Sequence, residues 1–252
     1  MKKKSQELSL AIKACKKAGS ILKEDFKKKG KQNTENKANK VILNMISHIF
    51  PDHQILSENS GLTNKKNNSK SIWIIDSLDG TDNFKRKIPY FGVSIALEKN
   101  KNIILGVIFN PLTNKIFYAQ KGKGAFLNNY KISVSKTKSY KDALISTHGP
   151  FKKNKNKKSI LNQYTKASNL FSKSIRKFGS PALDLAFLAC GKIDAFWVHK
   201  VNIWDVAAGL IILKEANGKF QLKKLTKIND TKVSLVASNK NLFKKIKNLF
   251  KI

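Results

Sequence analysis

The sequence predicts an α/β protein, with an N-terminal α+β part and a C-terminal α/β part. Three observations predict this class. Apolar residues recur at helical spacing over residues 4–28 and again over residues 41–49, as they do in amphipathic helices. Strand-like runs joined by turn residues follow, which predicts an antiparallel meander. Beyond residue 140, strand-like and helical stretches alternate, which is typical of α/β proteins.

The N-terminal elements follow from their local patterns. The first helix is predicted to end at the polar stretch "GKQNTENK" and the second at Pro51, which cannot continue a helix. "HQILS" is predicted to be a short strand, "LTNKKNNSK" a surface loop and "SIWII" (71–75) a strand at the centre of a sheet. The meander strands are "YFGVSIALE", "NIILGVIFN", "KIFYAQK" and "KISVS", with "GKGAF" (122–126) as a hairpin turn.

The C-terminal part begins with the strand-like run "ALISTHG". A surface helix over residues 152–168 and a helix over residues 181–190 are expected next, then the strand "IDAFWV". A helix from Asp205 to about Asn217, the strand "VSLVAS" and a basic amphipathic helix over residues 241–251 complete the chain. No linker rich in Pro, Gly or Ser separates residues 1–140 from residues 141–252, so we expect these two parts to form one compact unit.

Composition predicts a cytoplasmic protein. Lys13, Lys16 and Lys17 interrupt the apolar residues near the N-terminus, so the apolar core of a signal peptide is missing. No run of about 18 consecutive apolar residues exists, so no membrane span is expected. Cys15 and Cys190 lie in apolar contexts without metal-ligand spacing, and we expect both to be reduced thiols.

The chain is strongly basic, with 50 Lys and Arg against 16 Asp and Glu and a net charge of +34. Such a charge is typical of proteins that bind nucleic acids. Only Arg86 and Arg176 are arginines, however, and the lysines are spread along the whole chain. Because phosphate and base recognition usually recruits arginine, the pattern favours compositional drift of a Lys- and Asn-rich chain. Nucleic-acid binding stays open as the alternative.

Three of the 16 acidic residues lie within the seven residues 76–82. Asp76 directly follows the predicted strand "SIWII", and Asp79 precedes Gly80 and Thr81. Carboxylates at the end of a buried strand face the crevice where ligands bind, and the backbone amides after a glycine can hold an anion. Mg²⁺ ions between the carboxylates and a phosphate would reconcile the two charges. The alternative from these residues alone is a turn with helix-capping aspartates.

Two further acids, far from residues 76–82 in the sequence, lie in motifs of their own. Glu58 follows the strand in "HQILSENSG", and Asp205 begins the helix in "NIWDVAAGLIILKEANG", where it also fits a simple N-cap. With "DSLDGTDNF" between them, these motifs resemble the inositol monophosphatase family, and the resemblance covers nearly the whole chain. It implies a layered α-β-α-β-α fold of the sugar-phosphatase type. It also implies Mg²⁺-dependent, lithium-sensitive hydrolysis of a phosphate monoester and a homodimer.

The resemblance assigns roles to individual residues. Glu58 and Asp76, with the Leu78 carbonyl, would bind the first of two or three Mg²⁺ ions. Asp76, Asp79 and Asp205 would bind the second. The catalytic residues would be Glu58, Thr81 and Asp76, with Thr81 and Glu58 orienting and deprotonating the attacking water. The amides of Gly80 and Thr81 would hold the phosphate.

Five positions differ from the family pattern or match it only loosely. Ser77 stands where the family usually has proline, and Asn59 replaces the second acid of a Glu-Glu pair. Glu35 lies near an early family aspartate that supports a third, weaker metal. Val198 stands seven residues before Asp205, where inositol-hydrolysing members carry a glutamate that contacts inositol hydroxyls. Asp82 matches no ligand position, and we interpret it as a first-turn helix acid or an outer-shell group.

The expected function is hydrolysis of a small polyol or sugar phosphate by metal-activated water, like that of inositol monophosphatases, without a membrane partner. Because Val198 cannot bond a hydroxyl, inositol specificity is in doubt. Fructose-1,6-bisphosphatase, histidinol-phosphatase and 3′,5′-bisphosphate nucleotidase activities stay open. The alternative of another class is binding to RNA or a transcription complex.

Overall fold

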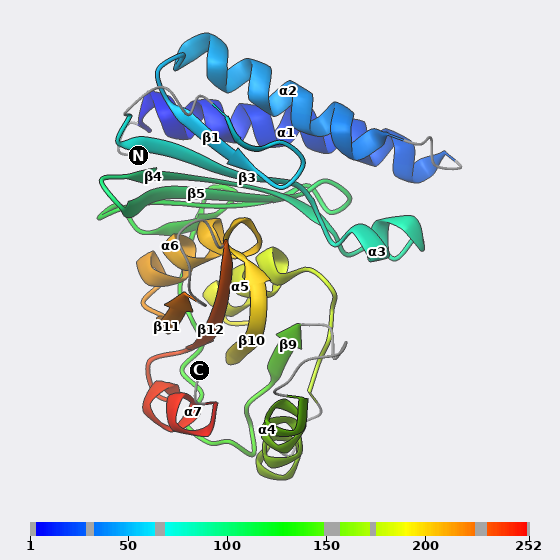
Figure 1. Cartoon of the computed structure of the whole chain (residues 1–252). Helices are drawn as coiled ribbons and strands as arrows, with labels where there is room; N and C mark the ends of the chain where they lie inside the picture. Colours follow the sequence, from blue (N-terminus) through cyan, green and yellow to red (C-terminus); the bar gives the residue numbers. More distant parts are fainter. Residues whose placement is uncertain are drawn as a thin grey trace.

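Two β-sheets and three layers of helices alternate along the long axis of the molecule (Figure 1). The structure is a computed structural model, and it describes residues 4–28, 33–63, 69–148, 157–171, 175–224 and 231–250. The first helical layer consists of α1 (Gln6–Lys27) and α2 (Thr34–Ile49). The first helix lies within its predicted range, whereas the second begins at Thr34, inside the stretch "GKQNTENK" that was predicted to be a polar break. The Ser5 hydroxyl, which accepts the N–H of Leu8, caps the first of them.

The larger sheet has eight strands in the order β2-β1-β3-β4-β5-β6-β7-β8. Their bounds are β1 (Gln54–Ser57), β2 (Gly61–Thr63), β3 (Ser71–Asp79), β4 (Gly92–Lys99), β5 (Asn102–Asn110), β6 (Lys115–Gln120), β7 (Ala125–Leu127) and β8 (Tyr130–Ile132). From β3 onward each strand pairs antiparallel with the next, so the predicted meander is confirmed. The sequence did not predict β2 or β7, and residues 64–68 of the predicted surface loop lie outside the described part of the chain.

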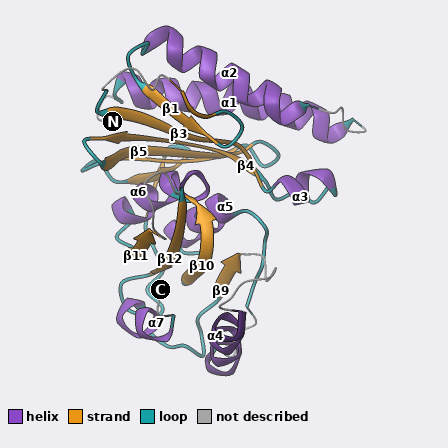
Figure 2. Cartoon of the chain, viewed as in Figure 1, coloured by secondary structure: helices purple, strands orange, loops and turns teal. Residues whose placement is uncertain are grey.

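The middle helical layer lies between the two sheets (Figure 2). It consists of α5 (Pro181–Ala189) and α6 (Ala207–Glu215), with the 3₁₀ turn η1 (Ile203–Asp205) before α6. Both helices are apolar almost all round, as helices packed on both faces must be. A Cβ added at Gly106 of β5 would lie 2.6 Å from the carbonyl oxygen of Ala208 on α6. Because Gly106 has no side chain and Ala208 carries only a methyl group, α6 can pack directly on the strand.

The smaller sheet has the order β11-β12-β10-β9, and its outer face is covered by α4 (Lys157–Leu170) and α7 (Phe243–Leu249). Its strands are β9 (Ile145–His148), β10 (Ala195–Asn202), β11 (Lys219–Lys224) and β12 (Lys232–Ser238). The rings of Trp197 and Phe250 stack at 4.2 Å in the outer core, which confirms that the C-terminal helix packs on the protein. The strand β11 was not predicted from the sequence.

The short helix α3 (Thr81–Lys85) projects from the end of β3 (Figure 1). Lys87, just beyond it, donates from Nζ to the carbonyls of Phe26 and Lys28 at 2.7 and 2.8 Å. A lysine at these carbonyls satisfies the C-terminal end of α1 and complements its dipole. The contact ties the segment after α3 to the first helical layer. Among the described residues, no helix has the length and apolar character that crossing a membrane requires.

Candidate metal and phosphate site

A bulge in β3 turns Asp76 and Asp79 to the same face of the sheet. Asp76 pairs with Ser94 of β4, but Asp79 pairs with Gly92, so three residue steps on β3 match two on β4. In a regular strand, residues three apart point to opposite faces. One extra residue reverses that parity, because directly paired residues share a face. The predicted strand "SIWII" therefore continues four residues further, through both carboxylates.

Three carboxylates from three separate segments meet at this bulge. Glu58 directly follows β1, Asp76 lies in β3 and Asp205 ends η1. One potential ligand oxygen of each lies within 4.8 Å of those of the other two. Asp76 is only 2% exposed, and the N–H of Leu78 donates to its Oδ1 at 2.9 Å. The N–H of Asn202 donates to Asp205 Oδ2 at 2.9 Å, which orients that carboxylate. The sequence predicted all three of these acids as metal ligands.

Asp79 lies beside this group but is held differently. Its Oδ2 accepts the hydroxyl of Ser180 and the N–H of Ala182, the latter at 2.9 Å. These two groups belong to the N-terminus of α5, where Ser180 is the N-cap. A carboxylate at a helix N-terminus is stabilised by the exposed N–H groups and the helix dipole. One of the Asp79 carboxylate oxygens is thus bound by the middle layer.

The predicted phosphate-binding residues form the turn between β3 and α3. Gly80 has φ 92°, and a Cβ there would lie 3.0 Å from the carbonyl oxygen of Tyr90. Only glycine meets both conditions without strain. The Thr81 hydroxyl donates to the Leu78 carbonyl at 3.1 Å, so two predicted site atoms bond one another. Asn83 anchors α3 to neighbouring segments, because its side-chain amide donates to the carbonyls of Tyr90 and Phe178, both at 2.7 Å.

Burial, together with the crowding of negative charge, raises the pKa of each acid in the site. For Asp76 the largest cause is burial, followed by the charges of Asp79, Glu58 and Asp205. Burial and the charge of Asp205 likewise raise the pKa of Asp79. Burial raises the pKa of Asp205 to about 7, although the Asn202 N–H and the charge of Lys232 lower it. Three acids whose ligand oxygens lie this close together, next to the buried Asp79, favour a bound cation.

The three departures Glu35, Asn59 and Ser77 contact one another. The Asn59 side-chain amide donates to Glu35 Oε1 at 2.8 Å, and the Ser77 hydroxyl lies 3.2 Å from Asn59 Oδ1 and 3.3 Å from the Glu35 carbonyl oxygen. The charge of Glu35 also raises the pKa of Glu58, second to burial. Asparagine thus places a hydrogen-bond donor against Glu35 where a second acid would repel it.

Val198 and Asp82 lie outside the carboxylate cluster. Val198 is fully buried in β10 and belongs to the core between the smaller sheet and the middle helices. Asp82 is exposed in the first turn of α3. Its charge reaches His148, whose pKa burial lowers to about 4. Asp82 therefore has the position of a first-turn helix acid, as one of the two interpretations from the sequence states.

The model of the inositol monophosphatase family matches residues 3–250 of the chain. The chain belongs to the inositol monophosphatase family. The inositol-1-monophosphatase of Caulobacter vibrioides is 34% identical over 93% of this chain and 97% of that protein. The Nus factor SuhB of Xylella fastidiosa is 35% identical over 84% of this chain and 80% of that protein.

Solved structures of this family share the fold. The extragenic suppressor protein suhB of Bartonella henselae matches with a TM-score of 0.89 and 33% identity, over 98% of this chain and 99% of that chain. The inositol monophosphatase of Anabaena matches with a TM-score of 0.84 and 31% identity, over 96% and 94%. The family resemblance and the layered fold class predicted from the sequence are therefore confirmed. The family contains phosphoric monoester hydrolases, and the names of the relatives include both phosphatases and Nus factors.

Sequence reasoning missed the residues that hold the carboxylates in place. Ser180 before Pro181 fits the N-cap and N1 positions of a helix, so its capping role could have been predicted. Its bond to Asp79 could not, because 101 residues separate them. Asn83 gives no sequence signal beyond its polarity, and its contacts with Tyr90 and Phe178 arise only in the folded chain. Asn202 does carry a local signal, because Asn202 and Asp205 occupy the N-cap and N3 positions of a capping box at η1.

Proposed function

We propose that the chain hydrolyses a small phosphate monoester with the help of Mg²⁺, as an inositol monophosphatase-like enzyme. The observation that carries the proposal is the group formed by Glu58, Asp76 and Asp205, whose ligand oxygens lie within 4.8 Å of one another. Carboxylate oxygens are the ligands that Mg²⁺ prefers. The burial of Asp76 and the raised pKa of each acid fit a site that is stabilised by divalent cations.

The residues proposed to hold two or three Mg²⁺ ions are Glu58, Asp76, Asp79, Asp205 and the carbonyl of Leu78. When bound, such ions supply charge neutralisation for the phosphate and raise the acidity of a water molecule. The bond from Asp79 to the α5 N-terminus holds its carboxylate in one orientation beforehand. A preoriented ligand loses less conformational entropy when the cation binds.

The protein's own groups carry the proposed proton and phosphate steps. Glu58, at the exposed edge of the cluster, takes the proton of the attacking water, and its raised pKa suits it for that role. Thr81 orients the same water through its hydroxyl. The N–H groups of Gly80 and Thr81 hold the phosphate oxygens, and Asn83 keeps α3 in the required place.

The substrate is proposed to be a small polyol or sugar phosphate. The apolar, buried side chain of Val198 offers no hydrogen bond to an inositol hydroxyl. A pocket that lacks a contact to a hydroxyl discriminates poorly for it. A bisphosphorylated sugar, histidinol phosphate and a 3′,5′-bisphosphate nucleotide therefore belong in the same substrate screen as the inositol phosphates. By family resemblance we also propose a homodimer located in the cytoplasm.

The first prediction tests the carboxylate cluster. Asp76→Asn keeps the size of the side chain but removes a charge that would contact the metal, so phosphate release should fall on the order of 100-fold or more. Mg²⁺ affinity, measured by isothermal titration calorimetry, should fall as well. The measurement is phosphate release over a panel of phosphorylated metabolites, with and without Mg²⁺ and Li⁺.

Asp52→Asn is the matched control, because Asp52 is an exposed acid outside the cluster. In EDTA, Asp52→Asn should keep the wild-type melting behaviour, whereas Asp76→Asn should melt no lower than the wild type, because it removes a carboxyl whose pKa is raised by burial and by the charges of the neighbouring acids. Full Mg²⁺-dependent activity in Asp76→Asn, or an equal loss in Asp52→Asn, would contradict the assigned site.

A second candidate function is binding to RNA or a transcription complex. The net charge of +34 and the relatives named Nus factor SuhB favour it. Binding that neutralises several phosphates should weaken steeply between about 50 and 200 mM salt. Selective binding of one RNA sequence at physiological salt would support this function. Weak binding without sequence preference would instead support compositional drift.

A further inference from the structure

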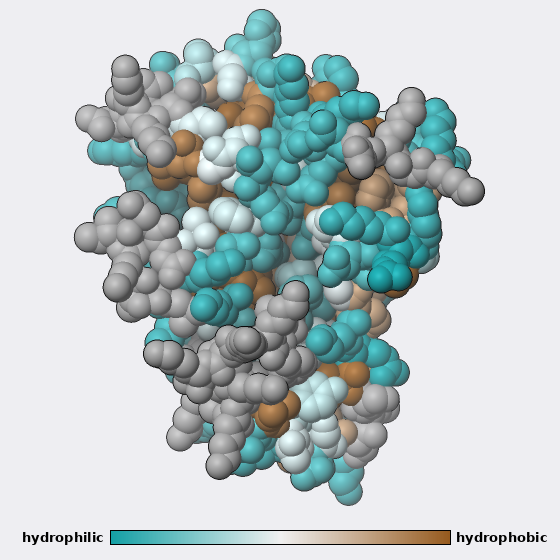
Figure 3. Space-filling model, turned by 45° about the vertical axis from the view of Figure 1, so that its right-hand side comes forward, coloured by the Kyte–Doolittle hydropathy of each residue, from teal (hydrophilic) through white to brown (hydrophobic). Residues whose placement is uncertain are grey.

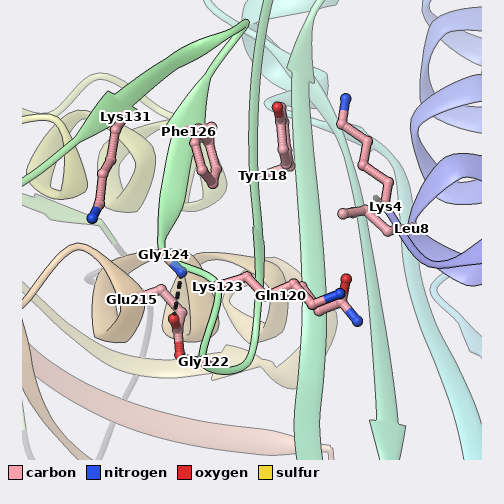
Figure 4. Close-up of a pocket in the computed structure, with 10 residues that line it drawn as sticks. All are labelled: Lys4, Leu8, Tyr118, Gln120, Gly122, Lys123, Gly124, Phe126, Lys131 and Glu215. Carbon is pink, nitrogen blue, oxygen red and sulfur yellow. Dashed lines mark hydrogen bonds between the residues drawn. The ribbon is translucent and has the colours of Figure 1, made fainter. Parts of the chain in front are cut away.

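A cavity of about 470 Å³ lies on the larger sheet beside the β6–β7 hairpin (Figure 4). Its lining comes from the start of α1, the strands β6, β7 and β8, and the end of α6. None of these lining residues belongs to the carboxylate cluster. The volume falls within the range of small-molecule binding sites, about 300–1,000 Å³. The cavity is therefore a candidate binding site for a second ligand, distinct from the proposed phosphatase substrate.

Two aromatic rings and two lysines form a row along one side of this cavity. Tyr118 of β6 pairs with Phe126 of β7, and Phe126 pairs with Lys131 of β8, so all three side chains share one face of the sheet. The rings of Tyr118 and Phe126 stack with centroids 5.3 Å apart. Lys4 Nζ lies 4.5 Å from the centroid of the Tyr118 ring. Figure 4 shows the row in the order Lys131, Phe126, Tyr118, Lys4.

The charge balance of the cavity favours an anion. Lys4, Lys123 and Lys131 line it, against the single acid Glu215. Both carboxylate oxygens of Glu215 accept backbone N–H groups of the hairpin, from Gly122 at 2.9 Å and Gly124 at 2.8 Å. A cation–π contact involves one side of an ammonium group, so the Lys4 ammonium can still donate to an anion. The electropositive edges of the two aromatic rings add to the attraction.

The same cavity also offers apolar area and a hydrogen-bond acceptor. Leu8 and the two rings provide the apolar wall. Gln120 Oε1 is buried, and within the described part of the chain it has no hydrogen-bond partner. A buried acceptor without a partner is destabilising unless a donor reaches it. The complementary ligand would carry a planar ring, a hydrogen-bond donor on that ring and an anionic group.

We propose that this cavity binds a mononucleotide, with the base against Tyr118, Phe126 and Leu8 and the phosphate beside the ammonium group at one end of the row, that of Lys4 or that of Lys131. A base supplies the planar ring and the donor, and a phosphate supplies the negative charge. Bases pack favourably on aromatic side chains whatever their sequence. The volume accommodates one nucleotide unit rather than an extended strand.

The test uses 3′,5′-cyclic AMP, a phosphodiester that the proposed monoesterase site would not hydrolyse. Its binding is measured by calorimetry in EDTA at low salt, for the wild type and for Lys4→Gln/Lys131→Gln. The double variant should raise the Kd about tenfold. Phe126→Leu should weaken cyclic AMP binding more than it weakens binding of inorganic phosphate.

The matched control is Lys192→Gln/Lys245→Gln, which removes two other lysines that lie 5.0 and 5.2 Å from the ring centroids of Phe187 and Tyr140. It makes the same change in net charge and should alter the Kd less than about twofold. An equal loss in both double variants would reduce the effect to net charge and overturn the proposal. So would the absence of saturation up to about 5 mM ligand.

Two further arms locate and identify the ligand. Asp76→Asn should leave cyclic AMP binding unchanged, and a loss there would place the ligand in the carboxylate site instead. A single-stranded RNA tetranucleotide should bind no more tightly than cyclic AMP, because the cavity takes one unit. Much tighter binding with a steep salt dependence would overturn the mononucleotide assignment in favour of single-stranded RNA.

Discussion

Individual residues show which parts of the site depend on local sequence. Asp76, Asp79, Asp205 and Glu58 could be predicted because a basic chain concentrates its few acids in family-like motifs. Ser180 could not be predicted as an Asp79 partner, since only the packed middle layer brings α5 to the end of β3. Assignment of the metal-binding roles stays a prediction, whereas the mutual proximity of three of the four acids is a feature of the fold.

The second prediction concerns Ser180. Ser180→Ala removes the N-cap hydroxyl of α5 and a hydrogen-bond donor to the buried Asp79. Loss of a cap destabilises a protein by about 1 kcal/mol, and loss of one of the two hydrogen bonds to Asp79 Oδ2 adds about 1 kcal/mol or more, although the Ala182 N–H still donates to that oxygen. The free energy of unfolding, measured by urea titration in EDTA, should therefore fall by about 2 kcal/mol or more. Ser168→Ala, at an exposed position on α4, should have little effect. A wild-type value for Ser180→Ala would contradict the coupling between Asp79 and α5.

Elements were predicted more reliably where their periodicity was uninterrupted. The helices α1 and α2 and the strand β5 match the apolar pattern. The strand β3 does not end at Ile75, because two aspartates with low strand propensity are retained in it by the bulge and by their partners. The three-residue strand β7 and the lysine-rich β11 lack a clear alternation, so their pairing in the sheet could not be predicted from local sequence.

The third prediction concerns the turn into α3. Gly80→Ala should be destabilising by about 1–3 kcal/mol, because φ is 92° and the new Cβ would meet the Tyr90 carbonyl at 3.0 Å. Phosphate release should fall too, since the N–H groups of the turn would shift. Gly61→Ala separates strain from collision: Gly61 has φ 65°, but nothing lies within 4 Å of its added Cβ. It should be destabilising by only about 1 kcal/mol. Equal effects in urea unfolding would show that the contact with Tyr90 is unimportant.

At the scale of the whole molecule, the surface and the interior differ in how their charged groups are solvated. Hydrophilic side chains cover much of the face in Figure 3, with small hydrophobic patches between them. The interior holds several acids whose pKa burial raises. Asp184 in α5 is one of them: burial raises its pKa to about 8, although the hydrogen bond from the Tyr90 hydroxyl, 2.8 Å long, lowers it. Composition gives the net charge of the chain, but it does not show which acids are buried and therefore have a raised pKa.

The fourth prediction is a pH dependence of stability. An Asp carboxyl titrates near 3.9 in an unfolded chain, whereas that of Asp184 titrates near 8 in the folded protein. Between these values the folded state holds one more proton, so the free energy of unfolding falls as pH rises, by at most about 1.4 kcal/mol per unit. Asp184→Asn should remove this component. The difference between variant and wild type in urea unfolding with EDTA should therefore grow in favour of the variant from pH 5 to pH 8. A difference that does not change with pH would contradict it.

The acids of the candidate site are synthesised at very different times, because they lie far apart in the sequence. Glu58 and Asp76 emerge in the first third of the sequence, whereas Ser180 and Asp205 emerge more than 100 residues later. During synthesis the early acids therefore exist for a time without the helix terminus that binds Asp79 and without the fourth carboxylate. If these acids hold a metal as proposed, the full set of ligands exists only once Asp205 has been added to the chain. Assembly of the four acids therefore waits for the last fifth of the sequence.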